Sequence, residues 1–212
     1  MAKDDIEAVA WYRKAAEQGL ALAQSNLGGV YANGLGVPKD DVQAVAWYRK
    51  AAEQGLADAQ YNLGVAYDIG QGVPKDDVQA VAWYRKAAEQ GFANAQYNLG
   101  VMYANGLGVA KDEVEAVAWY RTAAEQGFAS AQSNLGLMYE NGQGVAKDDI
   151  QAVAWYRKAA DQGNAYAQSN LGFMYENGQG VSKDDIQAVA WYRKAADQGN
   201  AYAKAALIRL GK

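Results

Sequence analysis

The chain repeats itself with a fixed period, and this feature restricts its possible folds more than any other. The hexapeptide "AVAWYR" begins at Ala8 and returns every 36 residues, so that six copies lie within 212 residues. Such self-similarity is typical of arrays in which one structural unit stacks on its own copies. We expect residues 1–212 to form a single array. Cut at "KDD" and its counterparts, the array consists of the units 3–38, 39–74, 75–110, 111–146, 147–182 and the C-terminal cap 183–212.

Each unit contains two helical patterns separated by glycines. In "DDVQAVAWYRKAAEQG", Asp40 can cap the start, Gln43 can complete a capping box and Gly55 can end the helix with a left-handed backbone. Trp47 lies at the edge of the apolar arc of this helix, where we expect it to seal contacts between repeats.

The second pattern, "ADAQYNLGVAYDIG", has a glycine in its middle, although glycine costs a helix about 1 kcal/mol relative to alanine. Because this glycine returns in every complete unit, we predict that a neighbouring helix approaches closely at that point. The connector "GQGVPKD" predicts a turn in which Val73 tucks under as a plug. No stretch shows the alternation of a strand. The five glycines are Gly28, Gly64, Gly100, Gly136 and Gly172.

The motifs "AVAWYRKAAEQG", "AQYNLGVAY" and "GQGVPKDD" recur from residue 3 to 203 and resemble a Sel1-like repeat (SLR) array, a relative of the tetratricopeptide repeats. The resemblance implies an all-α fold, a right-handed α-solenoid of antiparallel helix pairs with a concave groove. It also implies a scaffold or adaptor that holds other proteins together, without catalysis. In the phase of that family, the chain begins with an unpaired second helix near 5–18 and closes with an unpaired first helix near 201–210. Some secreted members have a disulfide in each repeat, and this cysteine-free chain departs from them.

Comparison of the copies with one another locates a variable face. The changes concentrate in the glycine-containing helix at the spacing i, i+3, i+7, i+10, beside an unchanged asparagine. Many of the variable residues are aromatic or aliphatic, as in interaction surfaces, and several acidic ones favour a basic partner. By resemblance, this face lines the groove and the asparagines bond the backbone of an extended peptide. The predicted partner-binding residues are Asn26, Asp58, Tyr61, Asn62, Val65, Asp68, Asn94, Tyr97, Asn98, Val101, Ser133, Asn134, Leu137, Glu140, Tyr166, Asn170, Phe173 and Glu176.

Four alternatives stay open at this stage. The variable positions can reflect drift on an exposed face, or their aromatic residues can pack between successive helices. The repeated asparagine can tie one repeat to the next through a backbone bond. The whole chain can also be a purely structural or engineered consensus-like array without a specific ligand, self-associating end to end through the outer face of its first helix.

Composition excludes several function classes. A net charge of −4 argues against a nucleic-acid binder, and the absence of cysteine and histidine removes the commonest metal ligands and general base. No apolar run reaches membrane-spanning length, and the start of the chain is charged, which favours the cytoplasm, although a secreted or periplasmic chain with its leader removed would look the same. The paired aspartates at each helix start lack the spacing of a calcium loop. We therefore expect no catalytic residue, cofactor or metal, and a protein or peptide partner for a monomer or a weakly self-associating chain.

Overall fold

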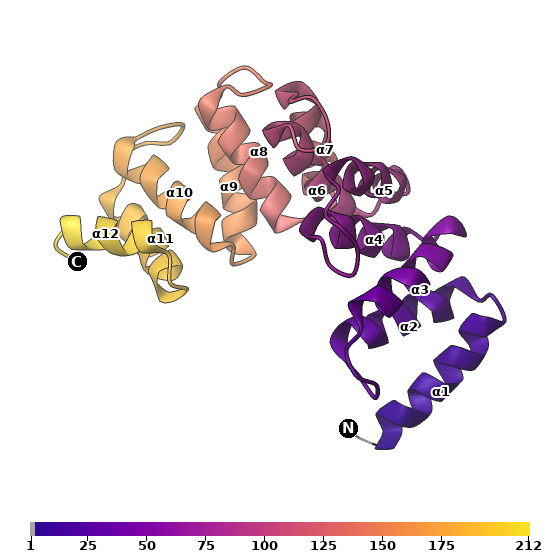
Figure 1. The fold of residues 1–212 in the computed structure, drawn as a ribbon. Coiled ribbons are helices and arrows are strands. Elements are labelled where there is room, and N and C mark those ends of the chain that lie inside the picture. The colour runs from indigo at the N-terminus through magenta and orange to yellow at the C-terminus, as the bar shows by residue number, and fades with distance from the viewer. Residues whose placement is uncertain (1–2) are drawn as a thin grey trace. The chain divides into compact units, whose positions relative to one another are not determined.

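The computed structural model describes the backbone of residues 3–212 and the side chains from Glu7 onward, and these residues form twelve helices and no strand (Figure 1). Helices with odd numbers carry "AVAWYR", and helices with even numbers from α2 to α10 carry the "LG" pair. The helices are α1 (Lys3–Glu17), α2 (Ala21–Asn33), α3 (Asp41–Glu53), α4 (Ala57–Ile69), α5 (Asp77–Glu89), α6 (Ala93–Asn105), α7 (Glu113–Glu125), α8 (Ala129–Asn141), α9 (Asp149–Asp161), α10 (Ala165–Asn177), α11 (Asp185–Asp197) and α12 (Ala201–Arg209).

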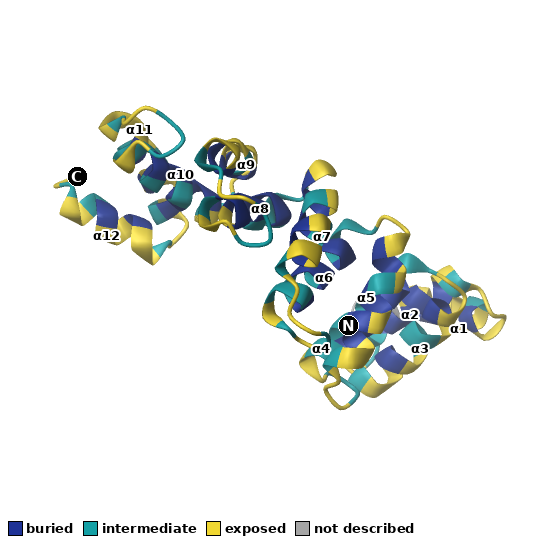
Figure 2. Ribbon diagram, turned by 90° about the horizontal axis from the view of Figure 1, so that it is seen from above, coloured by how far each residue is buried: buried dark blue, intermediate teal, exposed yellow. Residues whose placement is uncertain are grey.

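The chain divides into two compact units, Met1–Lys111 and Asp112–Lys212. Within each unit every helix packs against the helix before it and the helix after it, and each carries a buried stripe and an exposed one (Figure 2). The all-α class and the helix-pair solenoid with a 36-residue period are thereby confirmed. The single array over residues 1–212 stays a prediction. Among the described residues, no helix combines the length and the apolar character that a bilayer crossing requires.

The predicted helix ends are present. The side chain of Asp40 accepts a hydrogen bond from the backbone N–H of Gln43 at 3.0 Å, and Gly55 after α3 has a φ of +91°. The other half of the capping box is replaced, because the backbone N–H of Asp40 donates to the carbonyl of Tyr31 at 3.0 Å. This bond ties the start of α3 to the end of α2.

The connector after α4 folds as a turn. Gly72 has a φ of +73°, and a Cβ atom there would lie 2.1 Å from the carbonyl oxygen of Asp41, so only glycine fits. Val73 packs against the buried cluster that contains Val45 and Leu63. The predicted plug is therefore confirmed, and the connector is held against the start of α3.

Four of the five mid-helix glycines receive a tyrosine ring within their own unit. A Cβ atom on Gly28 would lie 2.6 Å from Cδ1 of Tyr48, a distance that no real carbon contact allows. The same holds for Gly64 against Tyr84, with the same distance of 2.6 Å. The predicted close approach is thus confirmed at four of the five glycines, where each ring lies on the bare backbone of the preceding helix. The other two such pairs are Gly136 with Tyr156 and Gly172 with Tyr192.

The tryptophans join consecutive repeats, as predicted. Trp47 of α3 packs against the cluster of Val9 and Leu27 from the preceding helices. Its outer face is covered by the ammonium group of Lys50, which lies 3.9 Å from the ring centroid. The ring of Trp47 therefore contacts the core and also carries a cation on its surface.

Candidate functional site

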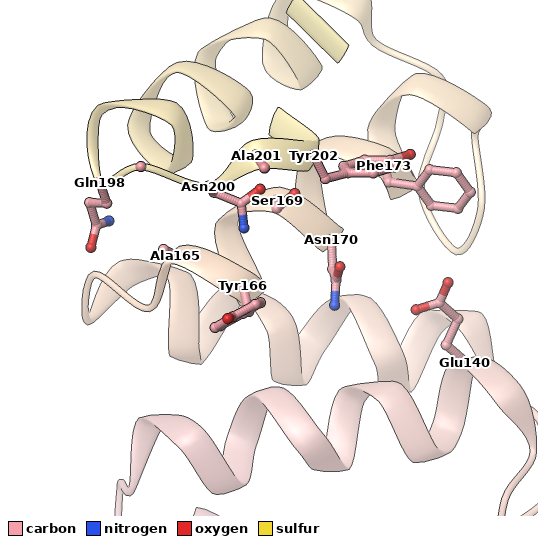
Figure 3. A pocket seen from close by; sticks show the side chains of 11 residues that line it. Glu140, Ala165, Tyr166, Ser169, Asn170, Phe173, Gln198, Asn200, Ala201 and Tyr202 are labelled. Carbon is pink, nitrogen blue, oxygen red and sulfur yellow. The ribbon is translucent and has the colours of Figure 1, made fainter. Parts of the chain in front are cut away.

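The second unit contains a cleft of about 740 Å³ between α10 and the start of α12 (Figure 3). One wall consists of Tyr166, Asn170 and Phe173 of α10, and Glu140 at the end of α8 closes one side. The opposite wall is the stretch 198–202, which leads into α12. The structure thus brings four of the predicted partner-binding residues to one cavity.

Two substitutions within the repeat explain why the cleft is open. In the first unit, Tyr61 and Phe92 hold the equivalent positions, and their ring centroids lie 5.2 Å apart. Three repeats later these positions are Ser169 and Asn200, both of which line the cleft. Small polar side chains therefore leave empty the space that a pair of aromatic rings fills in the first unit.

Asparagine caps hold two tyrosines at the mouth of the cleft. The side chain of Asn164 accepts from the backbone N–H of Ala167 at 2.9 Å, and Asn200 caps α12 in the same way. The residue two positions after each cap is a tyrosine, and Tyr166 and Tyr202 are 75% and 51% exposed. The earlier even-numbered helices have leucine or phenylalanine at the N-cap position and no side-chain cap, so this arrangement is specific to the last two repeats.

A buried hydroxyl group lines the cleft without a hydrogen-bond partner. Ser169 is only 3% exposed, and its Oγ atom has no hydrogen-bond partner among the described residues. In the first repeat the equivalent Ser25 donates to Oδ2 of Asp58 at 3.0 Å, 33 residues further along the chain. The corresponding residue for Ser169 is Tyr202, which provides no such bond. Burial without a bond costs free energy that a ligand could recover.

Three of the four acidic residues of the predicted face, Asp68, Glu140 and Glu176, accept a hydrogen bond from a buried tyrosine. The hydroxyl of Tyr156 donates to Oε2 of Glu140 at 2.5 Å, and Tyr84 donates to Oδ2 of Asp68 at 3.1 Å. Burial, with the adjacent Glu140 carboxylate, raises the pKa of Tyr156, so its hydroxyl keeps the proton that it donates. These acidic residues are therefore also part of the junction between the two helices of a repeat.

The repeated asparagine joins the same junctions. The amide of Asn170 faces the hydroxyl of Tyr156 in the preceding repeat and opposes the rise of its pKa, and Asn98 does the same to Tyr84. One alternative for these asparagines was a backbone bond that ties one repeat to the next. The contact does join two repeats, but it goes to a tyrosine side chain. An amide has two donors and an acceptor, so one such contact leaves capacity for a ligand.

In the first unit the predicted residues are more dispersed. Tyr61 is half-buried between the rings of Tyr84 and Phe92, at 5.9 and 5.2 Å between centroids. Asn62 and Val65 line a separate cavity of about 110 Å³. Asn26 and Asp58 are exposed, and Asp68, Asn94, Tyr97, Asn98 and Val101 are half-buried.

The remaining predicted residues belong to the second unit. On α8, Ser133 is buried, Asn134 is half-buried and Leu137 is exposed. Glu176 at the end of α10 accepts from the hydroxyl of Tyr192 at 2.8 Å and forms an ion pair with Arg209. None of these four residues lines the cleft, so the structure separates them from Glu140, Tyr166, Asn170 and Phe173.

Sequence reasoning missed one wall of the cleft. Tyr202 and Asn200 lie 36 residues after Tyr166 and Asn164 and thus continue the variable face into the last unit. That unit was interpreted only as a cap, and the repeat register was the signal that would have found them. Within the described part of the chain, no cluster of acidic side chains is arranged to hold a metal ion.

Repeated helix pairs, joined by glycine–tyrosine junctions, define the class of α-helical solenoid proteins. The Sel1 repeat model matches residues 1–20, 21–56, 57–92, 93–128, 129–164 and 165–200, so the chain belongs to the Sel1 repeat family. Each complete match begins at the first residue of an even-numbered helix and includes the odd-numbered helix after it, which is the predicted phase. Proteins of this family are generally non-catalytic scaffolds for protein–protein interaction.

Solved structures of related proteins agree with this assignment. A protective antigen of uropathogenic Escherichia coli with an SLR fold is 43% identical, with a TM-score of 0.91, over 97% of this chain and 44% of that one. A Sel1 repeat protein from Oxalobacter formigenes is 40% identical, with a TM-score of 0.84, over 95% of this chain and 86% of that one. Cysteine-rich protein B of Helicobacter pylori is 28% identical, with a TM-score of 0.50, over 63% of this chain and 96% of that one. The chain spans less than half of the Escherichia coli protein, and no curated protein matches it.

Proposed function

We propose that the chain is a non-catalytic scaffold that binds an extended segment of a partner protein in the cleft between α10 and α12. The observation that carries this proposal is the exposure of Tyr166 and Tyr202 around a cavity of about 740 Å³. Exposed tyrosines beside a concave surface are typical of interaction sites, because they bury a large area at a small entropic cost. A cavity of this size matches the range that holds a few side chains.

Polar groups of the cleft would hold the backbone of the segment. The half-buried amide of Asn170 lines the cleft, and the buried hydroxyl of Ser169 lacks a partner among the described residues. These groups can satisfy peptide N–H and C=O groups that the aromatic walls remove from water. Asn134 and Leu137 of α8 extend the proposed contact along the unit. In the first unit, Tyr61 and its neighbours would add weaker contacts, because Phe92 fills the equivalent space.

The test fills the cleft with a side chain that the repeat already accommodates. Ser169→Tyr places tyrosine where α4 has Tyr61 and α6 has Tyr97, so we expect the fold and its melting curve to persist. Peptides are first selected from a random library displayed against the full chain, and their affinity is then measured by fluorescence anisotropy. We expect Ser169→Tyr to weaken binding by at least about tenfold, because the ring occupies the volume of the ligand.

The matched control is Ser25→Tyr, the same change at the same repeat position in the first unit, away from the cleft. It should leave the affinity unchanged. Recovery of no peptide above background, or equal binding by the wild type and Ser169→Tyr, would refute the proposed function.

End-to-end self-association is the second candidate, and the first helix supports it. Trp11 is 63% exposed, whereas its counterpart Trp83 is 9% exposed, so α1 has an open outer face. The last helix opposes it, because α12 carries Ile208 where α2, α4, α8 and α10 have the glycine that receives a tyrosine ring. Ile208 would therefore block Tyr12 of a second copy. We expect light scattering to show a monomer across a concentration series, and Ile208→Gly to increase association.

The proposal keeps the cytoplasm as the location, since a chain without cysteine requires no oxidising compartment.

A further inference from the structure

Glu140 brings a carboxylate to the cleft without a cation to balance it. Its Oε2 atom accepts from the hydroxyl of Tyr156 at 2.5 Å, and no ion pair among the described residues includes Glu140. We infer that the cleft binds an arginine side chain of the partner segment, with its guanidinium group on the Glu140 carboxylate. This inference rests on the proposed function and names the chemistry of the ligand.

The next repeat shows how an arginine binds such a carboxylate. Glu176 is the counterpart of Glu140, 36 residues later, and its Oε2 atom accepts from Tyr192 at 2.8 Å as Glu140 accepts from Tyr156. Arg209 nevertheless donates to both carboxylate oxygens of Glu176, its Nη1 atom to Oε1 and its Nη2 atom to Oε2 at 2.8 Å. A carboxylate that already holds a tyrosine hydroxyl in this fold can therefore accept the two-pronged guanidinium group.

The sequence supplies that arginine at one repeat and omits it at the other. Arg209 follows Glu176 by 33 residues, and the residue 33 positions after Glu140 is Phe173. Figure 3 shows the ring of Phe173 on the same side of the cleft as the carboxylate of Glu140. Replacement of the internal arginine by phenylalanine thus removes the internal partner and adds an aromatic face. A guanidinium group stacks on such a face while its N–H groups reach a carboxylate.

Asp68, the counterpart in the first unit, does not offer the same site. It accepts from Tyr84 at 3.1 Å, and Val101 holds the position of Phe173, so no aromatic face is available there. Tyr97, which lies 29 residues after Asp68 as Ser169 lies 29 residues after Glu140, places a half-buried tyrosine where the cleft has a serine. The carboxylate, the aromatic ring and the open volume coincide at Glu140.

The experiment uses blocked amino acids as probes of the isotope-labelled full chain. N-acetyl-arginine-N-methylamide is titrated while NMR follows the backbone amides of residues 140, 170 and 173. The blocked citrulline has nearly the same shape without the charge, and the blocked lysine has the charge without the fork. We expect saturable shifts with arginine, weaker binding of lysine and no response to citrulline.

Four variants locate the contact. Glu140→Gln keeps an acceptor for Tyr156 but removes the charge, and should weaken arginine binding by at least about tenfold. Phe173→Arg reproduces the Glu176–Arg209 arrangement within the chain, and should abolish the response. Phe173→Leu should weaken it by a few-fold, through loss of stacking only. Asp161→Asn, which removes an exposed charge of the same unit outside the cleft, should change nothing.

The outcomes separate this inference from the proposed function. Equal responses to arginine and citrulline, equal binding of lysine, or unchanged binding by Glu140→Gln would overturn the arginine contact. If displayed peptides still bind and Ser169→Tyr still blocks them, the scaffold function stands without that contact. If the display selection yields no peptide, the proposed function is refuted. The titration then decides separately whether Glu140 binds the guanidinium group.

Discussion

Two adjacent glycines in α2 provide a sharp test of the junction between repeats. A Cβ atom on Gly28 would lie 2.6 Å from Cδ1 of Tyr48, whereas one on Gly29 would lie 3.7 Å from the Tyr48 hydroxyl oxygen, an ordinary contact. Both residues are helical, and neither has a positive φ. The substitutions Gly28→Ala and Gly29→Ala therefore share their helix-propensity gain and differ in the collision with the ring.

The expected magnitudes follow from these two terms. Alanine stabilises a helix interior by up to about 1 kcal/mol relative to glycine, and this gain applies to both variants. The overlap at Gly28 is close to 1 Å, and overpacking of this kind costs roughly 1–3 kcal/mol. We expect Gly29→Ala to stabilise the chain by as much as about 1 kcal/mol. Gly28→Ala should be less stable than Gly29→Ala by about 1–3 kcal/mol.

The assay combines guanidinium unfolding, followed by circular dichroism, with hydrogen exchange of the α2 amides. Exchange is needed because the stability of a repeat array is a sum of local terms, so that one repeat can open before the others. A Tyr48→Leu background, with a smaller side chain at the junction, should reduce the difference between the two variants. The reasoning is refuted if Gly28→Ala is as stable as Gly29→Ala.

Two further predictions concern the hydroxyl and carboxylate contacts. Tyr156→Phe removes the bond to Glu140 and should lower the free energy of unfolding by about 1–2 kcal/mol. Tyr48→Phe is the control, because its repeat has alanine in place of the acid, and it should cost less than about 0.5 kcal/mol. Equal losses of stability in chemical denaturation would contradict this prediction. The hydrogen bond from Arg209 holds the pKa of Glu176 below its ordinary value of 4.5. Charged Glu176 therefore stabilises the last helix pair above that value, and this contribution disappears as the pH falls through the lower folded-state pKa. NMR titration of the Glu176 carboxyl carbon checks this, and a midpoint at or above 4.5 would refute it.

The helices, their ends and their junctions could be predicted from the sequence. Four such features follow from chemistry that acts within a few residues or that repeats with the period. They are the cap at Asp40, the left-handed Gly55, the Val73 plug and the close approach at Gly64. Repetition makes the prediction stronger, because a costly glycine that returns in each unit requires a packing reason. The interaction face could be located only as one side of a helix, since periodicity gives the direction of a side chain and not its neighbours.

Only the tertiary structure decided which members of that face meet. Tyr61 and Phe92, or Ser169 and Asn200, are 31 residues apart in the chain, and whether they fill or open one space depends on how successive repeats lie together. The bonds from Tyr156 to Glu140 and from Arg209 to Glu176 likewise join different helices. The sequence determined the repeating unit because local interactions suffice to form it. The cleft and its unbalanced carboxylate arise from differences between repeats, and such differences acquire a meaning only when packing brings them side by side.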